Sequence, residues 1–172
     1  KINYVDVGAR EDISNLWKKI EKCINVFGFE TDPDELKRIK NKFPSRTYYE
    51  FGLWSEEANL KLYITQDASS SSIYEPNLSE NQNYKSKYHD CRNLNKVVNV
   101  KCKKMDSLLT ISPDFIKIDT QGSEYEIIKG ARKLLTHNCP LVSLETWTRD
   151  VYKKSPRMDP IISLMYEYGY EI

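Results

Sequence analysis

The sequence lacks several features that mark particular classes of protein. No apolar run in its 172 residues approaches the roughly 20 that a membrane-spanning helix needs, so we predict no membrane span. Basic and acidic residues balance at 26 against 25, which leaves no bulk electrostatic argument for nucleic acid as a partner. No secretory signal segment is visible. The sequence opens directly on a strand-like stretch, and we expect residues to be missing at both ends.

Cysteine and histidine are also scarce. The four cysteines form no Cys-x-x-Cys pair, and the only histidines are His89 and His137. A structural zinc site needs closely spaced ligands of these types, so we predict none. Cys23 and Cys102 fall in apolar, strand-like runs and are predicted to be buried free thiols, which favours a reducing, cytoplasmic location.

Glycine is scarce where a dinucleotide-binding protein would need it. Residues 4–8 (Tyr-Val-Asp-Val-Gly) predict a buried strand that ends in a tight turn, and apolar spacing predicts a helix over about 12–22. A G-x-G-x-x-G fingerprint would seat a pyrophosphate there, but only Gly8 is present, and Glu11 and Asp12 crowd the helix start with negative charge. We therefore favour a phosphate-free, positively charged nucleoside, S-adenosylmethionine, over NAD.

The rest of the chain alternates strand and helix patterns, which is typical of a single α/β domain, residues 1–172, with a mostly parallel central sheet. Asp32 predicts a helix N-cap, Ser123 and Glu126 a capping box, and Gly169 a helix end. Further strands are expected near 23–29, 46–51, 60–65, 97–102, 114–119 and 140–145, and helices near 32–43, 123–135 and 158–168.

One strand pattern stands where a crossover helix would be expected. Residues 60–65 alternate strictly, so we predict a β-hairpin inserted after the third strand, with 55–59 as its connection. Residues 66–95 are polar and predict an irregular insertion. Tyr74, Tyr84 and Tyr88 within it argue against plain disorder.

Acids fall at or near the carboxyl ends of four predicted strands. Ligands of open α/β sheets bind at that edge. Four carboxylates in one crevice would repel one another unless something cationic or hydroxyl-rich lay among them, and desolvation would raise their pKa values. The simplest relief is a ligand with a ribose, an amino group and a positive centre. A helix cap or a salt bridge could explain each acid alone, but their joint placement favours a ligand site. The four are Asp6, Glu30, Asp119 and Glu145.

Four segments resemble the FkbM family of S-adenosylmethionine-dependent methyltransferases. They are Tyr-Val-Asp-Val-Gly-Ala-Arg (4–10), Gly-Phe-Glu-Thr-Asp-Pro-Asp (28–34), Phe-Ile-Lys-Ile-Asp-Thr-Gln-Gly-Ser-Glu-Tyr-Glu-Ile-Ile-Lys-Gly-Ala (115–131) and Leu-Glu-Thr-Trp (144–147). The third is the most specific. The resemblance implies a Rossmann-like class I methyltransferase fold, and usually O-methylation of a hydroxyl on a sugar, polysaccharide or secondary metabolite. The chain departs from the family pattern after Gly8, where another glycine often follows.

The resemblance also implies roles for residues at the matching positions. The implied cofactor site comprises Asp6 and Gly8 beside the methionine part, Glu30 and Thr31 at the ribose, Gly52 and Leu53 at the adenine, and Asp119 next to the methyl group.

Methyl transfer to a hydroxyl benefits from a general base. We predict Asp119 in that role, with Glu124 or Glu145 as alternatives. Residues 69–72 and Tyr74 are candidates for the acceptor side, although an ordinary surface loop would explain them equally well. These acids could also support metal assistance, but nothing requires a metal.

Two other interpretations of the whole chain stay open. One is a ligand-binding or scaffolding domain that keeps the fold without turnover. The other is an NAD-dependent oxidoreductase, which the missing glycine fingerprint disfavours. We expect a small-molecule or glycan acceptor as partner, and the sequence does not determine the oligomeric state.

Overall fold

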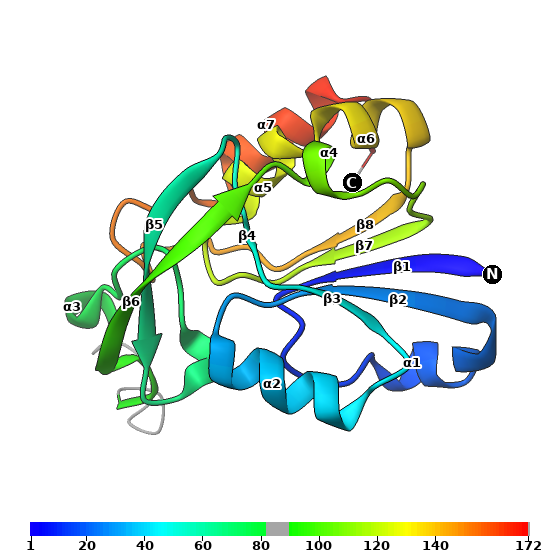
Figure 1. The fold of residues 1–172 in the computed structure, drawn as a ribbon. Coiled ribbons are helices and arrows are strands. Elements are labelled where there is room, and N and C mark those ends of the chain that lie inside the picture. The colour runs from blue at the N-terminus through cyan, green and yellow to red at the C-terminus, as the bar shows by residue number, and fades with distance from the viewer. Residues whose placement is uncertain (82–89, 172) are drawn as a thin grey trace.

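The computed structural model describes residues 1–81 and 90–171, so Tyr84, Tyr88 and His89 lie outside the described residues. Its centre is a sheet of five parallel strands in the order β3-β2-β1-β7-β8 (Figure 1). This confirms the predicted α/β fold with a mostly parallel sheet. The strands are β1 (Ile2–Val7), β2 (Ile24–Phe29), β3 (Thr47–Tyr49), β7 (Phe115–Ile118) and β8 (Leu141–Leu144).

Helices cover both faces of this sheet, which explains why its strands are apolar on both sides. Side chains alternate along β1: Val5 and Val7 belong to the main core, whereas Tyr4 packs against Trp17 on the other face. In Figure 1, α1 (Asn15–Lys18) and α2 (Pro33–Lys42) lie on one face, and α4 (Met105–Leu108), α5 (Glu124–Gly130), α6 (Arg132–Asn138) and α7 (Met158–Glu167) on the other.

Helix α2 begins as its sequence predicts. Asp32 is the N-cap, its carboxylate accepts a hydrogen bond from the Asp34 amide, and Pro33 occupies the first helical position. The helix that follows β1 is much shorter than predicted. The carboxylate of Asp12 accepts hydrogen bonds from the neighbouring Ile13 amide and from Arg46, and these bonds compete with helix formation. The helix α1 therefore starts only at Asn15.

A second sheet lies beyond the carboxyl ends of the parallel strands (Figure 1). It contains β4 (Gly52–Leu53), β5 (Ala58–Thr65) and β6 (Leu94–Lys103), with β6 in the middle. The expected hairpin is therefore wrong in its pairing: residues 60–65 pair antiparallel with β6, not with the third strand. Burial explains the choice, because Leu62 and Ile64 pack against Val100 and Cys102 of β6.

The helix predicted over 123–135 is two helices, α5 and α6, separated by Ala131. The carboxylate of Asp106 accepts hydrogen bonds from the Lys133 and Leu134 amides and so satisfies the start of α6. The predicted capping box is wrong, because the Ser123 hydroxyl makes no cap bond.

Of the predictions for single residues, some are confirmed and one is wrong. Cys102 is buried as predicted, but Cys23 is exposed, because it falls in a 3-10 turn (Glu21–Cys23) before β2 rather than in the strand. Gly169 follows α7 in the left-handed conformation, with φ +89°, as a helix end requires.

No helix in the described ranges is both long and apolar enough to span a lipid bilayer. Between β5 and β6 the described residues include a 3-10 turn at Ala68–Ser70, α3 (Leu78–Asn81) and a 3-10 turn at Asp90–Arg92 that leads into β6.

Candidate active site

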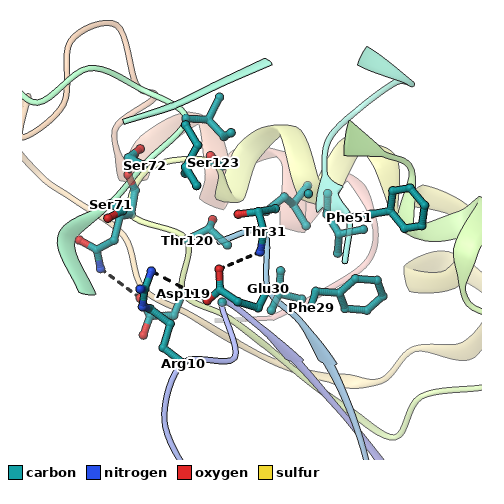
Figure 2. A pocket seen from close by; sticks show the side chains of 18 of the residues that line it. Arg10, Phe29, Glu30, Thr31, Phe51, Ser71, Ser72, Asp119, Thr120 and Ser123 are labelled. Atoms are coloured by element: carbon teal, nitrogen blue, oxygen red, sulfur yellow. Dashed lines mark hydrogen bonds and ion pairs between the residues drawn. The ribbon is translucent and has the colours of Figure 1, made fainter. Parts of the chain in front are cut away.

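A cleft of about 610 Å³, partly open to solvent, lies between the carboxyl ends of the parallel strands and the second sheet (Figure 2). Ligand sites of α/β sheets occupy this position. The cleft is lined by Val7, Gly8, Arg10, Phe29, Glu30, Thr31, Phe51, Gly52, Leu53, Leu62, Ser69, Ser71, Ser72, Ile73, Asp119, Thr120, Gln121, Ser123 and Ile127.

Most of the predicted cofactor residues line this one cleft, and three predicted acids do not. Asp6, Glu124 and Glu145 are absent from its wall. The cofactor residues that do line it are Gly8, Glu30, Thr31, Gly52, Leu53 and Asp119.

Gly8 forms the turn that closes one end of the cleft. Its φ of +81° is the left-handed conformation, and a Cβ there would overlap the carbonyl oxygen of Asp119. The amides of Gly8 and Ala9 both donate to the carbonyl of Phe29 at 3.0 Å. The ends of β1, β2 and β7 are therefore held in contact by backbone atoms at this turn.

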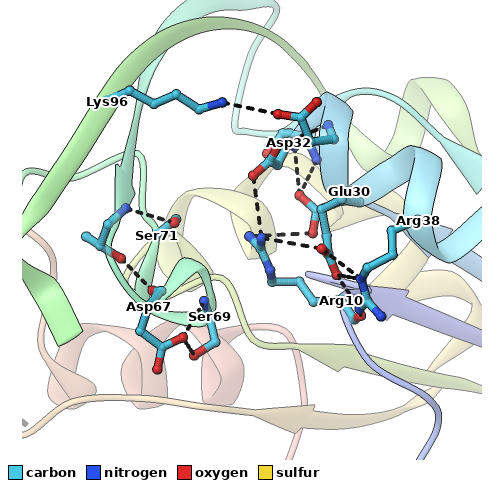
Figure 3. Close-up of polar contacts among 12 residues, drawn as sticks. Arg10, Glu30, Asp32, Arg38, Asp67, Ser69, Ser71 and Lys96 are labelled. Carbon is cyan, nitrogen blue, oxygen red and sulfur yellow. Dashed lines mark hydrogen bonds and ion pairs between the residues drawn. The ribbon is translucent and has the colours of Figure 1, made fainter.

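Glu30 is 5% exposed at the end of β2. Its Oε1 accepts hydrogen bonds from the Thr31 and Asp32 amides at 2.7 and 2.8 Å, which fixes the carboxylate toward the cleft (Figure 3). Its Oε2 faces Arg10 Nη1 at 3.9 Å, too far for a hydrogen bond. Burial raises the pKa of Glu30, and the charge of Arg10 opposes that shift.

Asp6 and Asp119 are bridged by a lysine that the sequence analysis overlooked. Lys117 Nζ lies 3.2 Å from Asp6 Oδ1 and 3.3 Å from Asp119 Oδ2. Burial raises the pKa of Asp6. Burial would also raise the pKa of Asp119, but a hydrogen bond with Glu145 and the charge of Lys117 bring it below its ordinary value.

The acids do have cationic groups beside them, as expected, but the protein itself supplies these groups, Lys117 and Arg10, so a ligand is not needed for this relief. A signal for Lys117 was present: it interrupts an apolar strand and lies two residues before Asp119, on the same face. Asp6 stands behind the cleft wall, next to Lys117.

Glu145 lies beside Asp119 at the end of β8. A hydrogen bond with Asp119 and then burial raise the pKa of Glu145 to about 8. The side-chain amide of Gln121 donates to both acids, at 3.1 Å to Asp119 Oδ1 and 3.0 Å to Glu145 Oε2. Asp119 and Glu145 therefore form a carboxyl pair, of which Asp119 reaches the cleft.

Glu124 has a different surrounding from the other acids. It is 1% exposed, and its carboxylate accepts hydrogen bonds from the Thr120 and Gly122 amides and the Thr120 hydroxyl. Burial raises its pKa. These contacts make Glu124 the organiser of the loop between β7 and α5, and they leave it turned away from a ligand in the cleft.

The charge argument against a pyrophosphate does not hold in the form predicted. Glu11 is paired with Arg38 at 3.6 Å, Asp12 with Arg46 at 2.5 Å, and neither acid lines the cleft. A different feature disfavours a dinucleotide: α1 starts seven residues after Gly8, so no helix N-terminus stands at the turn to receive phosphate.

The lining residues fit a nucleoside with ribose hydroxyls. Two polar atoms in the cleft wall lack a hydrogen bond within the protein. Ser123 Oγ is buried without one, and the contact of Glu30 Oε2 with Arg10 is too long to count as one. Native proteins rarely leave such groups unsatisfied. Phe51, Gly52 and Leu53 line the same cleft and add apolar atoms to its wall, which suits an adenine.

The acceptor candidates lie on the opposite wall. Ser69, Ser71 and Ser72 line the cleft, whereas Tyr74 packs on Trp54 with ring centroids 5.9 Å apart. Over the described parts of the chain, no group of three or more His, Cys, Asp or Glu side chains is arranged to hold a metal ion.

The parallel sheet, with strand order β3-β2-β1-β7-β8, and the cleft at its carboxyl edge define a Rossmann-like α/β protein with a candidate ligand site at the usual position. The chain belongs to the FkbM methyltransferase domain family, whose model matches residues 6–172. It is therefore a methyltransferase domain by family.

The fold is similar to a crystal structure of Methyltransferase FkbM from Methylobacillus flagellatus KT, with a TM-score of 0.57 and 16% sequence identity. The match covers 96% of this chain and 37% of that one, so this chain spans little more than a third of its length. The search of curated proteins found no match.

Proposed function

We propose that this chain is an S-adenosylmethionine-dependent O-methyltransferase that acts on a hydroxyl of a sugar, polysaccharide or secondary metabolite. The observation that carries the proposal is the meeting of Gly8, Glu30 and Asp119 around one cleft in a chain of the FkbM family. Three strand ends supply them, as a class I cofactor site requires.

The position of each cleft residue assigns it to one part of the cofactor. Oε2 of Glu30 accepts hydrogen bonds from the ribose hydroxyls, since Oε1 already accepts hydrogen bonds from two backbone amides. Gly8 leaves room beside Asp119 for the methionine part, while Gly52 and Leu53 border the adenine next to Phe51. Arg10, which reaches the cleft from the turn, is available to the carboxylate of the methionine part.

Bound S-adenosylmethionine supplies a methyl group on a positively charged sulfur, and transfer breaks the sulfur–carbon bond as an oxygen–carbon bond forms. Asp119 accepts the proton of the acceptor hydroxyl, because Lys117 and the hydrogen bond from Glu145 keep it ionised. In the serine-bearing wall, the Ser71 hydroxyl accepts from the Thr65 amide at 3.2 Å and can donate its own proton to a polyhydroxyl acceptor. A positioned base of this kind contributes roughly 10²–10⁴-fold to the rate.

The test combines binding with turnover. Calorimetric titration should show binding of S-adenosylmethionine and of its demethylated product, but not of NAD. Mass spectrometry of sugars, glycolipids and small metabolites after incubation with the cofactor should then show products 14 mass units heavier, as replacement of hydrogen by methyl requires.

Asp119→Asn should lower turnover by roughly 10²-fold or more while cofactor binding is largely kept. Asp159→Asn, an exposed acid in the first turn of α7, is the matched control and should change neither. Cofactor binding without methylation of any acceptor would favour a non-catalytic binding domain. If neither S-adenosylmethionine nor its demethylated product bound, both the methyltransferase and the non-catalytic binding domain would be refuted.

A further inference from the structure

Gln121 lies in the cleft wall in a conformation that a glutamine rarely adopts. Its φ is +59°, the left-handed region, and its side chain is 9% exposed. Such a conformation costs free energy and persists where the surrounding contacts determine it. Gln121 follows Asp119 by two residues, in the turn between β7 and α5.

Four contacts at hydrogen-bonding distance hold this residue, and those to the two acids favour one orientation of its side-chain amide. Its Nε2 donates to Asp119 and Glu145, and its Oε1 accepts from the Tyr152 hydroxyl at 2.9 Å. The opposite orientation of the amide would set an oxygen against two carboxyl oxygens, so the network itself selects the donor. The fourth bond comes from the Ser72 hydroxyl to the Gln121 carbonyl at 2.7 Å.

The same residue therefore connects the carboxyl pair with the serine-bearing wall. Ser72 lines the cleft, and Tyr152 also contacts the carbonyl of Ser70 at 2.9 Å, so both ends of Gln121 are tied to that wall. Tyr152 is fully buried, which leaves little freedom for the network to shift. Displacement of Gln121 would move the base and the opposite wall together.

We propose that Gln121 is a positioning residue: its amide holds Asp119 and Glu145 as one oriented pair with Asp119 facing the acceptor. The catalytic role of Gln121 rests on the proposed function, whereas the arrangement of Asp119 and Glu145 around its amide does not depend on that function. A hydrogen bond to an ionised carboxylate favours the ionised form, and a fixed base aligned with its substrate proton transfers it faster.

Other charged groups also face the pair. Lys117 lies 3.3 Å from Asp119 and holds Asp6 on its other side, while Glu124 acts on Glu145 through its charge. Lys117 and Glu124 are held by partners other than Gln121, namely Asp6 and the Thr120 and Gly122 amides. A change confined to Gln121 therefore isolates the contribution of its amide.

Gln121→Met keeps the length of the side chain and removes the donor, and Gln121→Gly removes the side chain while relieving the left-handed backbone. Lys154→Gly is the matched control, because Lys154 has φ +63° at an exposed site away from the cleft. Both Gln121 variants should lower kcat on the order of 10²-fold, since small misplacements cost that much. The KM for S-adenosylmethionine should change little.

The pH dependence separates positioning from general structural support. Loss of the Gln121 donor raises the pKa of Asp119, so the acidic limb of the pH–rate profile should move to higher pH in both Gln121 variants. Lys154→Gly should keep the wild-type profile. An unchanged kcat and profile in Gln121→Met and Gln121→Gly would overturn the proposal.

A titration without substrate makes the result independent of turnover. The side-chain carboxyl carbons of Asp and Glu can be followed by NMR from acid to alkaline pH. In Gln121→Met, both apparent pKa values of the Asp119–Glu145 pair should be higher than in the wild type. An unmoved titration overturns the proposal whatever the activity. A moved titration in a protein that binds no sulfur nucleoside would refute the proposed function and leave the positioning of the pair standing.

Discussion

At the scale of single residues, the site depends on backbone atoms that approach one another closely. The Gly8 amide reaches the Phe29 carbonyl, and its α-carbon lies against the carbonyl oxygen of Asp119. A side chain has no room there, because the neighbouring atom belongs to the backbone and cannot rotate away. The glycine was predictable from the turn after a strand, whereas the identity of its neighbour was not.

Gly8→Ala should therefore destabilise the protein by more than the roughly 1–2 kcal/mol that a left-handed conformation costs an alanine. Gly169→Ala is the control, because Gly169 has φ +89° with nothing within 4 Å of an added Cβ, so it should show the conformational cost alone. Urea unfolding followed by circular dichroism measures both. Equal losses for the two variants would contradict the role of the close approach.

At the scale of elements, local signals predicted well where a short motif satisfies its own backbone. The start of α2 is an example, because Asp32 and Pro33 act within one turn. The capping box at Ser123 failed because Ser123 has φ −88° and ψ 0°, in the helical region, whereas an N-cap needs an extended backbone. The helix α1 is short because Arg46, distant in sequence, holds Asp12. Sequence patterns do not show which distant side chain competes for a local partner.

The start of α6 gives a test at this scale. Asp106 comes from another helix, and its two oxygens accept from the Lys133 and Leu134 amides at 2.9 and 3.0 Å. Asp106→Ala should lower the free energy of unfolding by about 1–2 kcal/mol, as loss of a helix cap does. Asp106→Asn keeps one acceptor oxygen and should cost less. Urea unfolding of both variants would reject the capping role if they matched the wild type.

At the scale of the whole molecule, acids gather at the carboxyl edge of the parallel sheet, in the cleft wall and behind it, and the protein's own cations and amides compensate them. Burial raises the pKa of Asp6, Glu30 and Glu124, and a hydrogen bond with Asp119 raises that of Glu145. A carboxyl with a raised pKa keeps its proton after the unfolded chain has lost it. The stability it contributes is present below the unfolded pKa and is lost as pH rises through the folded value.

Stability should therefore fall as pH rises between about 5 and the pKa of Glu145 at about 8. Glu145→Gln removes a group whose pKa is raised to about 8 and should flatten the upper part of that decline. Urea midpoints of the wild type and the variant, measured at intervals across this range, make the comparison. Parallel curves would contradict the raised pKa of Glu145.

Taken alone, the sequence determined the parallel α/β sheet, the capped helix α2, the glycine turn and the acids at the strand ends. These follow from periodicity and short-range sterics, which neighbouring residues dictate. The tertiary structure decided which acids share the cleft, that Lys117 and Arg10 compensate them, and that β5 pairs with β6. Such outcomes depend on contacts between residues far apart in the chain, where burial and charge choose among partners that no local pattern distinguishes.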